Sequence, residues 1–226
     1  MTPDSFPFQI ATWLIPLVFA IVLHEISHGW VANAFGDPTA RKLGRLSPNP
    51  IRHIDPFGTL VLPMVLAVSG APVFGWAKPV PVVARRLRNP RLHMMIVALA
   101  GPGMNLLLAL LAAFGLAAAL AVVETPTLGN LFLIANLQNF LLINVFLALF
   151  NLLPIPPFDG GHVVEGLLPR PLAARYAKIG RFGFPVLIIL LVVLPLLSPS
   201  LNIVQRLVVP PVLAVVELLA RIAGIG

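Results

Sequence analysis

A long apolar stretch with three ionisable residues near its end is the feature that most limits how this chain can fold. Between Ile10 and Phe35 the only ionisable side chains are His24, Glu25 and His28. As a helix with a rise of about 1.5 Å per residue, this stretch would be roughly 39 Å long and could cross a bilayer. The two histidines would then lie roughly 10 and 16 Å inside its end, where ionisable side chains are costly and are candidates for function.

The composition agrees with a membrane environment. Hydrophobic residues make up 58% of the 226 residues and charged residues only 10%, with a mean hydropathy of +0.97. Soluble domains carry about a quarter charged residues, so we expect an all-α polytopic membrane protein that forms a single domain over residues 1–226. The net charge is +7, and the basic residues lie in short loops between apolar runs. This pattern favours a signal for orientation in the membrane over nucleic-acid binding. The absence of cysteine excludes disulfides and thiolate metal sites.

The apolar runs predict five or six membrane segments. The run over residues 57–74 is short and interrupted, so we expect it to enter and return as a strand or loop, or to lie within the bundle. Three basic regions between the runs predict a cytoplasmic side and an external N-terminus, with no cleavable signal peptide at residues 1–9. We expect a catalytic core at about 10–168 and further membrane segments at about 184–223. The runs occupy residues 10–35, 57–74, 94–123, 128–153, 184–197 and 203–223.

The stretch from His24 to His28 has the pattern of a zinc-protease site. Histidines four residues apart lie on one helix face and can bind one Zn²⁺, while Glu25 would lie beside the metal as a general base for a water molecule. Catalytic zinc usually takes three protein ligands. Asp159, which follows a proline-rich break and precedes two glycines, is the best candidate for the third ligand, and His162 is the alternative.

Three motifs in this order resemble the site-2 protease family of intramembrane zinc metalloproteases. They are His24 to His28, the Gly101-Pro102-Gly103-Met104-Asn105 stretch, and the proline-rich stretch from Asn151 to Gly161. The resemblance implies one zinc ion per chain, held by His24, His28 and Asp159, with Glu25 as the general base. It also implies a compact member without PDZ or CBS domains. Such a member would lie in the cell membrane with its active site towards the cytoplasm, and would cleave membrane-anchored proteins.

Two further elements would contact the substrate. Asn105 could donate a hydrogen bond to the developing oxyanion, or else bridge two helices. Residues 75–83 could form an edge strand in which Lys78, Val80 and Val82 present backbone groups to an extended peptide. The alternative for residues 75–83 is a proline-rich loop at the headgroups.

Other functions fit parts of the pattern. A membrane metal transporter would also place histidine and aspartate in lipid, although usually along a path rather than at one point. A catalytically inactive scaffold would keep the bundle without the chemistry. A different helical zinc protease would use a glutamate as its third ligand. The sequence leaves the substrate and the oligomeric state open.

Overall fold

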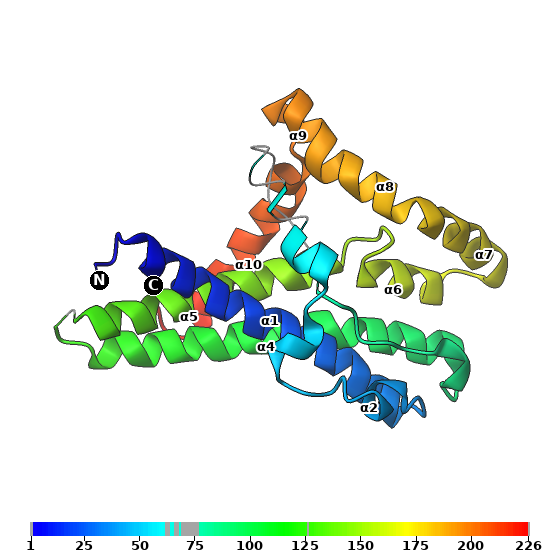
Figure 1. Cartoon of the computed structure of the whole chain (residues 1–226), viewed down its shortest axis with the longest axis horizontal. Helices are drawn as coiled ribbons and strands as arrows, with labels where there is room; N and C mark the ends of the chain where they lie inside the picture. Colours follow the sequence, from blue (N-terminus) through cyan, green and yellow to red (C-terminus); the bar gives the residue numbers. More distant parts are fainter. Residues whose placement is uncertain (1, 62–63, 66–67, 69–76, 126, 226) are drawn as a thin grey trace.

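Three long helices form the body of the molecule in this computed structural model, which describes residues 2–61, 64–65, 68, 77–125 and 127–225. They lie side by side, with α1 and α5 running in one direction and α4 in the other (Figure 1). All three are long and apolar enough to cross a membrane, which supports the prediction of an integral membrane protein. Their bounds are α1 Phe6–Ala34, α4 Pro90–Val122 and α5 Leu128–Asn151.

The ends of these helices follow from their sequences. The Asn89 side chain accepts from the Leu92 N–H at the start of α4, where Pro90 occupies the first helical position. Thr127 accepts from the Asn130 N–H at the start of α5 in the same way. Large apolar side chains remain exposed along all three helices, as expected for surfaces that face lipid.

The connection between α1 and α4 contains short helical turns and an extended segment. No strand occurs among the described residues, so the edge strand expected over residues 75–83 is wrong for the described part, 77–83, which is an extended loop. Most of the 57–74 run lies outside the described residues. The elements in this connection are α2 Thr39–Lys42, η1 Pro50–His53, η2 Pro56–Val61 and η3 Ala84–Arg86.

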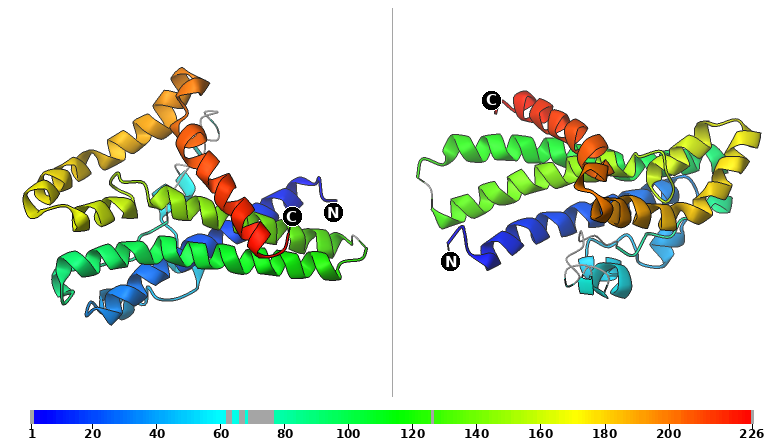
Figure 2. Two further views of the ribbon diagram at one scale, coloured as in Figure 1. Left: turned by 180° about the vertical axis from the view of Figure 1, so that it is seen from behind. Right: turned by 90° about the horizontal axis from the view of Figure 1, so that it is seen from above.

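The chain after α5 turns back and then leaves the bundle. Helix α6 packs against α4, whereas the following elements through α9 diverge from the bundle and α10 crosses back to it (Figures 1 and 2). The apolar helix at Pro185–Leu197 is shorter than the three long ones, so the prediction of five or six membrane segments is supported for three. The bounds are α6 Asp159–Leu167, α7 Arg170–Ile179, η4 Gly180–Phe182, α8 Gly183–Ile188, η5 Ile189–Val193, α9 Leu194–Leu197, η6 Pro199–Leu201, η7 Val204–Val208 and α10 Val209–Ile222.

Small side chains let α4 and α5 approach closely. Ala109, Ala112 and Ala113 of α4 are buried against Leu141 and Val145 of α5, and the end of η7 with α10 closes this cluster. Close approach through small residues is typical of helix packing in membranes, where the hydrophobic effect between helices is weak. The packing fixes the α4–α5 pair on which α1 and α6 lie.

Candidate metal centre

The two histidines of α1 point to the same place. His24 and His28 are one helical turn apart and both are buried. Their Nε2 atoms are 3.1 Å apart, and the two rings meet edge to face. The predicted helix register therefore brings two ring nitrogens to one point, 6 and 10 residues before the last residue of α1.

A proline-rich turn carries Asp159 to these histidines. After α5 the chain reverses through residues 152–158, and Asp159 is the first residue of α6. Gly160 makes the tight return feasible, because a Cβ there would lie 2.3 Å from the Leu152 carbonyl oxygen. Asp159 Oδ2 lies 3.2 Å from His24 Nε2 and 3.4 Å from His28 Nε2.

These three atoms have the spacing of a tetrahedral zinc site. Ligands about 2.0–2.1 Å from a tetrahedral zinc are separated by about 3.3 Å, which matches the observed 3.1, 3.2 and 3.4 Å. A point about 2 Å from all three atoms therefore exists just off their plane. The Asp159 Oδ2 atom is buried and has no hydrogen-bond partner, which a cation would satisfy. The donor set of two imidazoles and one carboxylate fits zinc.

Hydrogen bonds on the far side of each ring set its orientation. His28 Nδ1 lies 2.7 Å from the Val97 carbonyl oxygen, which can only accept, so Nδ1 carries a hydrogen. His24 Nδ1 lies 2.5 Å from Asn105 Oδ1. Because both Nδ1 atoms are donors, both Nε2 lone pairs are available to a metal, as is usual for histidine ligands with oriented partners.

Asn105 bridges helices beside His24. Its side chain is fully buried, and its Nδ2 donates to Asn144 Oδ1 at 2.7 Å and to the Ala20 carbonyl oxygen at 3.4 Å. Asn144 in turn donates to the Phe140 carbonyl of its own helix. Of the two roles expected for Asn105, the bridge between helices is the one seen, because both amide hydrogens are directed into the protein.

Gly101 of α4 forms one wall of the centre. A Cβ at this position would lie 2.5 Å from His24 Cε1 and 2.5 Å from His28 Nε2. Only a residue without a side chain allows α4 to pass this close to the two rings. Gly103, two residues further along, faces open space and has no such constraint.

Glu25 is directed towards the loop formed by residues 77–83. Its Oε2 accepts a hydrogen bond from the Val80 N–H at 2.7 Å. One carboxylate oxygen of Glu25 is therefore fixed by the backbone of residues 77–83. We call this segment the strap.

Comparison with known proteins assigns a family to this geometry. The family model described as Peptidase family M50 matches residues 12–193, which include all three ligand candidates and Glu25. The chain belongs to peptidase family M50. Membership of this family, together with the cluster of His24, His28 and Asp159, makes the protein a zinc metalloprotease of the site-2 protease group and confirms the resemblance seen in its motifs.

Relatives of this M50 protease carry names of the same kind. The chain is 39% identical over 189 residues to "Putative zinc metalloprotease YwhC" of Bacillus subtilis (strain 168), covering 83% of each chain. It is 32% identical over 198 residues to "Putative zinc metalloprotease Rip2" of Mycobacterium tuberculosis (strain H37Rv), covering 87% of this chain and 69% of the relative. No solved structure matches the chain significantly.

The remaining residues predicted for the site of the M50 protease, His162, Lys78 and Val82, are not part of the cluster of possible metal ligands. The His162 side chain is half exposed, and its Nδ1 atom lies 3.7 Å from Glu165 Oε2. Lys78 is exposed, and its backbone N–H donates to the His53 carbonyl at 2.8 Å. This N–H was expected to be free for a substrate peptide, but it is already paired within the protein. Val82 packs against the buried cluster of Ala32, Leu87 and Val97. The contact of these strap residues with substrate stays a prediction.

Two charged residues near the centre of the M50 protease were not singled out from the sequence. Asp37 is fully buried, and its Oδ2 accepts from the Val83 N–H at 2.6 Å. Burial raises the pKa of the Asp37 carboxyl, but hydrogen bonds from Thr39 and Val83 and the charge of Arg86 outweigh it, so its pKa lies below the ordinary 3.8. Arg45, also buried, donates to backbone carbonyls of the strap. A charged residue directly after a membrane helix is a signal that could have identified Asp37, whereas Arg45 lies eleven residues after Ala34 and has no such signal.

Proposed function

We propose that this M50 protease hydrolyses peptide bonds within or beside the transmembrane segments of membrane-anchored proteins. The observation that carries this proposal is the position of the metal centre, because two ligands and the general base lie on a lipid-facing helix long enough to cross the membrane. A soluble peptide would have little access to a centre at this depth.

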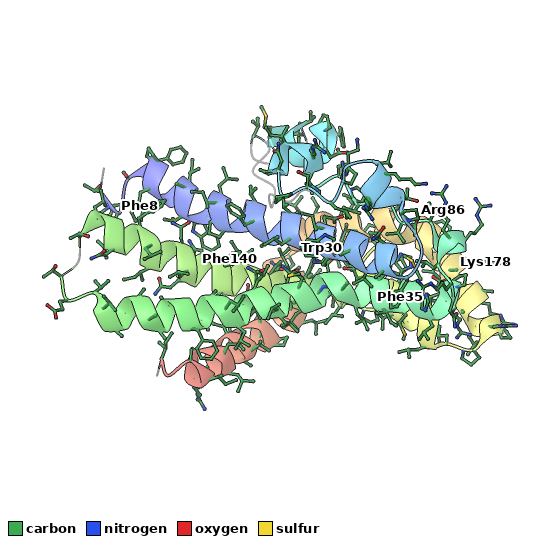
Figure 3. The ribbon with its side chains drawn as sticks, turned by 90° about the horizontal axis from the view of Figure 1, so that it is seen from below. Phe8, Trp30, Phe35, Arg86, Phe140 and Lys178 are labelled. Atoms are coloured by element: carbon green, nitrogen blue, oxygen red, sulfur yellow. The ribbon has the colours of Figure 1, made fainter. Side chains whose placement is uncertain are left out.

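The depth of the centre can be estimated from α1. His28 and His24 lie 6 and 10 residues before Ala34, or about 9 and 15 Å inside the end of the helix. Trp30, which follows His28 by two residues and is labelled in Figure 3, has an exposed side chain of the type enriched at membrane interfaces. A scissile bond would therefore reach the centre just below the headgroups.

The charge distribution supports an active site towards the cytoplasm. Arg86 and Lys178 lie at the end of the bundle where α1 finishes near Phe35, and Phe8 lies at the opposite end (Figure 3). Basic residues favour the cytoplasmic side, so this end would face the cytoplasm and the N-terminus the exterior. The cell membrane is the bilayer proposed.

The chemistry divides among a few side chains. His24, His28 and Asp159 would hold one zinc ion per chain, which when bound supplies Lewis acidity towards the scissile carbonyl and lowers the pKa of a water molecule. Glu25 accepts the proton from the attacking water and returns it to the leaving amine nitrogen. Asn105 holds the His24 ring in orientation. The helices packed around them restrict access of bulk water.

A metal transporter is less well supported by the arrangement of ligands. Transport needs successive sites along a path, whereas the described residues contain a single group of three histidine or acidic side chains close enough to share a metal. That group is accompanied by Glu25, a carboxylate that transport does not require. A proteolytic role accounts for all four residues.

The test is cleavage of single-span peptides by the purified full-length protein in detergent, with zinc measured in the same samples. We expect Glu25→Gln to retain zinc and to lose about 10²- to 10⁴-fold in turnover, because it removes only the general base. Mass spectrometry should locate the cut within or next to the apolar segment of the peptide.

Glu124→Gln is the matched control, because it neutralises an exposed carboxylate between α4 and α5. It should behave as the wild type. Equal cleavage by wild type and Glu25→Gln would contradict the proposal, as would cleavage restricted to peptides that lack an apolar segment. Zinc flux into vesicles without any peptide cleavage would favour a transporter instead.

A further inference from the structure

The strap lies directly on the catalytic helix. Val80, in the middle of the strap, is buried, and a Cβ on Gly29 of α1 would be only 2.9 Å from its Cγ1 atom. On its backbone side Val80 donates its N–H to Glu25 Oε2. The position of the strap therefore determines where this N–H points, and with it the position of the Glu25 carboxylate.

Arg45 holds the peptide group that contains this N–H. Its Nη2 atom donates to the carbonyl oxygens of Lys78 at 2.6 Å and Pro79 at 3.3 Å. The Pro79 carbonyl and the Val80 N–H belong to one planar peptide group, and in a trans peptide they point in opposite directions. Arg45 and Glu25 thus bind opposite edges of the same peptide plane.

The other end of the strap is held by Asp37. Its Oδ2 accepts the Val83 N–H at 2.6 Å, and its Oδ1 accepts the Thr39 N–H at 3.1 Å. A fully buried carboxylate satisfied by these donors fixes the strap to the turn after α1. Arg45 and Asp37 therefore bind the strap on both sides of Val80 by side-chain hydrogen bonds to its backbone.

We propose that Arg45 and Asp37 are positioning residues, which hold the strap so that the Val80 N–H fixes one oxygen of Glu25 and leaves the other for proton transfer. This inference rests on the proposed role of Glu25 as general base. A free glutamate side chain has three rotatable bonds, and ordering it for every turnover costs conformational entropy. The strap provides that order in advance, as supporting hydrogen bonds do in other metal sites.

The test compares turnover in five forms of the full-length protein besides the wild type. They are Arg45→Met, Arg45→Lys, Val80→Pro, the double variant Arg45→Met with Val80→Pro, and the control Arg52→Met. Arg52 makes a comparable side-chain bond to the Gly44 carbonyl rather than to the strap. Arg45 contacts Arg52 through the Arg52 backbone carbonyl, which the Arg52→Met substitution keeps.

We expect Arg45→Met to lower kcat about 10- to 100-fold with zinc content and KM unchanged. Arg45→Lys should recover part of the loss, because an ammonium group can still donate to the carbonyls. Val80→Pro deletes the N–H itself, so the double variant should be no slower than Val80→Pro alone. If Arg45→Met does not fold, Arg45→Lys takes its place in the same comparison.

Several results would overturn the proposal. A double variant clearly slower than Val80→Pro would show that Arg45 acts by another route. Loss of zinc in Arg45→Met, or an equal loss of turnover in Arg52→Met, would make its role a general structural one.

Hydrogen exchange tests the same contacts without any substrate. The non-proline amides of the strap, among them those of Val80 and Val83, should exchange faster in Arg45→Met and Asp37→Asn than in Arg52→Met. Unchanged exchange would also overturn the proposal. A wild type that cleaves no peptide would contradict the proposed function, but this exchange measurement would still decide whether Arg45 and Asp37 hold the strap.

Discussion

Replacement of Gly101 by alanine should remove zinc from the centre without disturbing the bundle. The added methyl group would lie 2.5 Å from His24 Cε1, 2.5 Å from His28 Nε2 and 2.6 Å from His24 Nε2. Ordinary contacts begin at 3.4 Å, so both rings would have to move by about 1 Å. Zinc–ligand distances tolerate only about 0.2 Å. We therefore expect zinc affinity to fall at least 10- to 100-fold, or about 1.4 to 2.8 kcal/mol.

Gly103→Ala is a closely matched control for this change. It lies on the same helix two residues further along, and an added Cβ would have no atom within 4 Å. Both variants gain up to about 1 kcal/mol of helix propensity, so any difference between them reports the contact with the histidines.

The measurement is zinc content after dialysis against a competing chelator, followed by cleavage of a single-span peptide. Thermal unfolding of both variants in detergent shows whether the bundle is retained. Gly103→Ala should match the wild type in zinc affinity and turnover. Zinc affinity of wild-type strength in Gly101→Ala would refute this account of the centre.

Three further changes test other parts of the structure. Asp159→Asn should keep the fold but lose zinc in the same dialysis assay, because it replaces the anionic ligand by a neutral amide; full zinc retention would exclude Asp159 as a ligand. Asn105→Ala should weaken zinc binding about 10- to 100-fold, because it frees the His24 ring. Asn139→Ala removes a different bond between α5 and α1 and should leave zinc binding unchanged. Equal losses of zinc affinity in the two variants would contradict a role of Asn105 in orienting His24. Asp37→Asn should lower the unfolding temperature at neutral pH, and the difference from wild type should vanish as the pH falls below 3.8 through the lowered pKa of the folded state. A difference that stays constant with pH would show that the carboxylate charge is not the cause.

The membrane helices and the cluster of His24, His28 and Asp159 were predictable because each has a local signal. Long apolar runs predicted α1, α4 and α5, since only helices satisfy their own backbone in lipid. Spacing of four residues placed His24 and His28 on one face, and the need for a third ligand selected Asp159, which the structure brings to both rings. These inferences need no knowledge of how the helices pack.

The supporting contacts were not predictable in the same way. The orientation of His28 depends on a backbone carbonyl at Val97, and a carbonyl has no signature in sequence. Gly101 was noted as part of a motif, and nothing in the sequence indicated that a Cβ at this position would meet the rings of His24 and His28. The prolines of the strap fit an edge strand and a loop equally well. The loop is seen because Arg45, Glu25 and Asp37 bind the backbone groups that a neighbouring strand would need.

The separation of the ligands along the chain gives the ion a mechanical effect as well as a chemical one. More than half of the chain lies between His24 and Asp159, including all of α4 and α5, so a bound metal would close this part of the chain into a loop. A ligand that binds only the folded state adds stability in proportion to the logarithm of its concentration. We therefore expect chelation to loosen α6 and the limb from α7 to α9 before the three long helices separate. The supply of zinc would then regulate the rigidity of the C-terminal third of the protease.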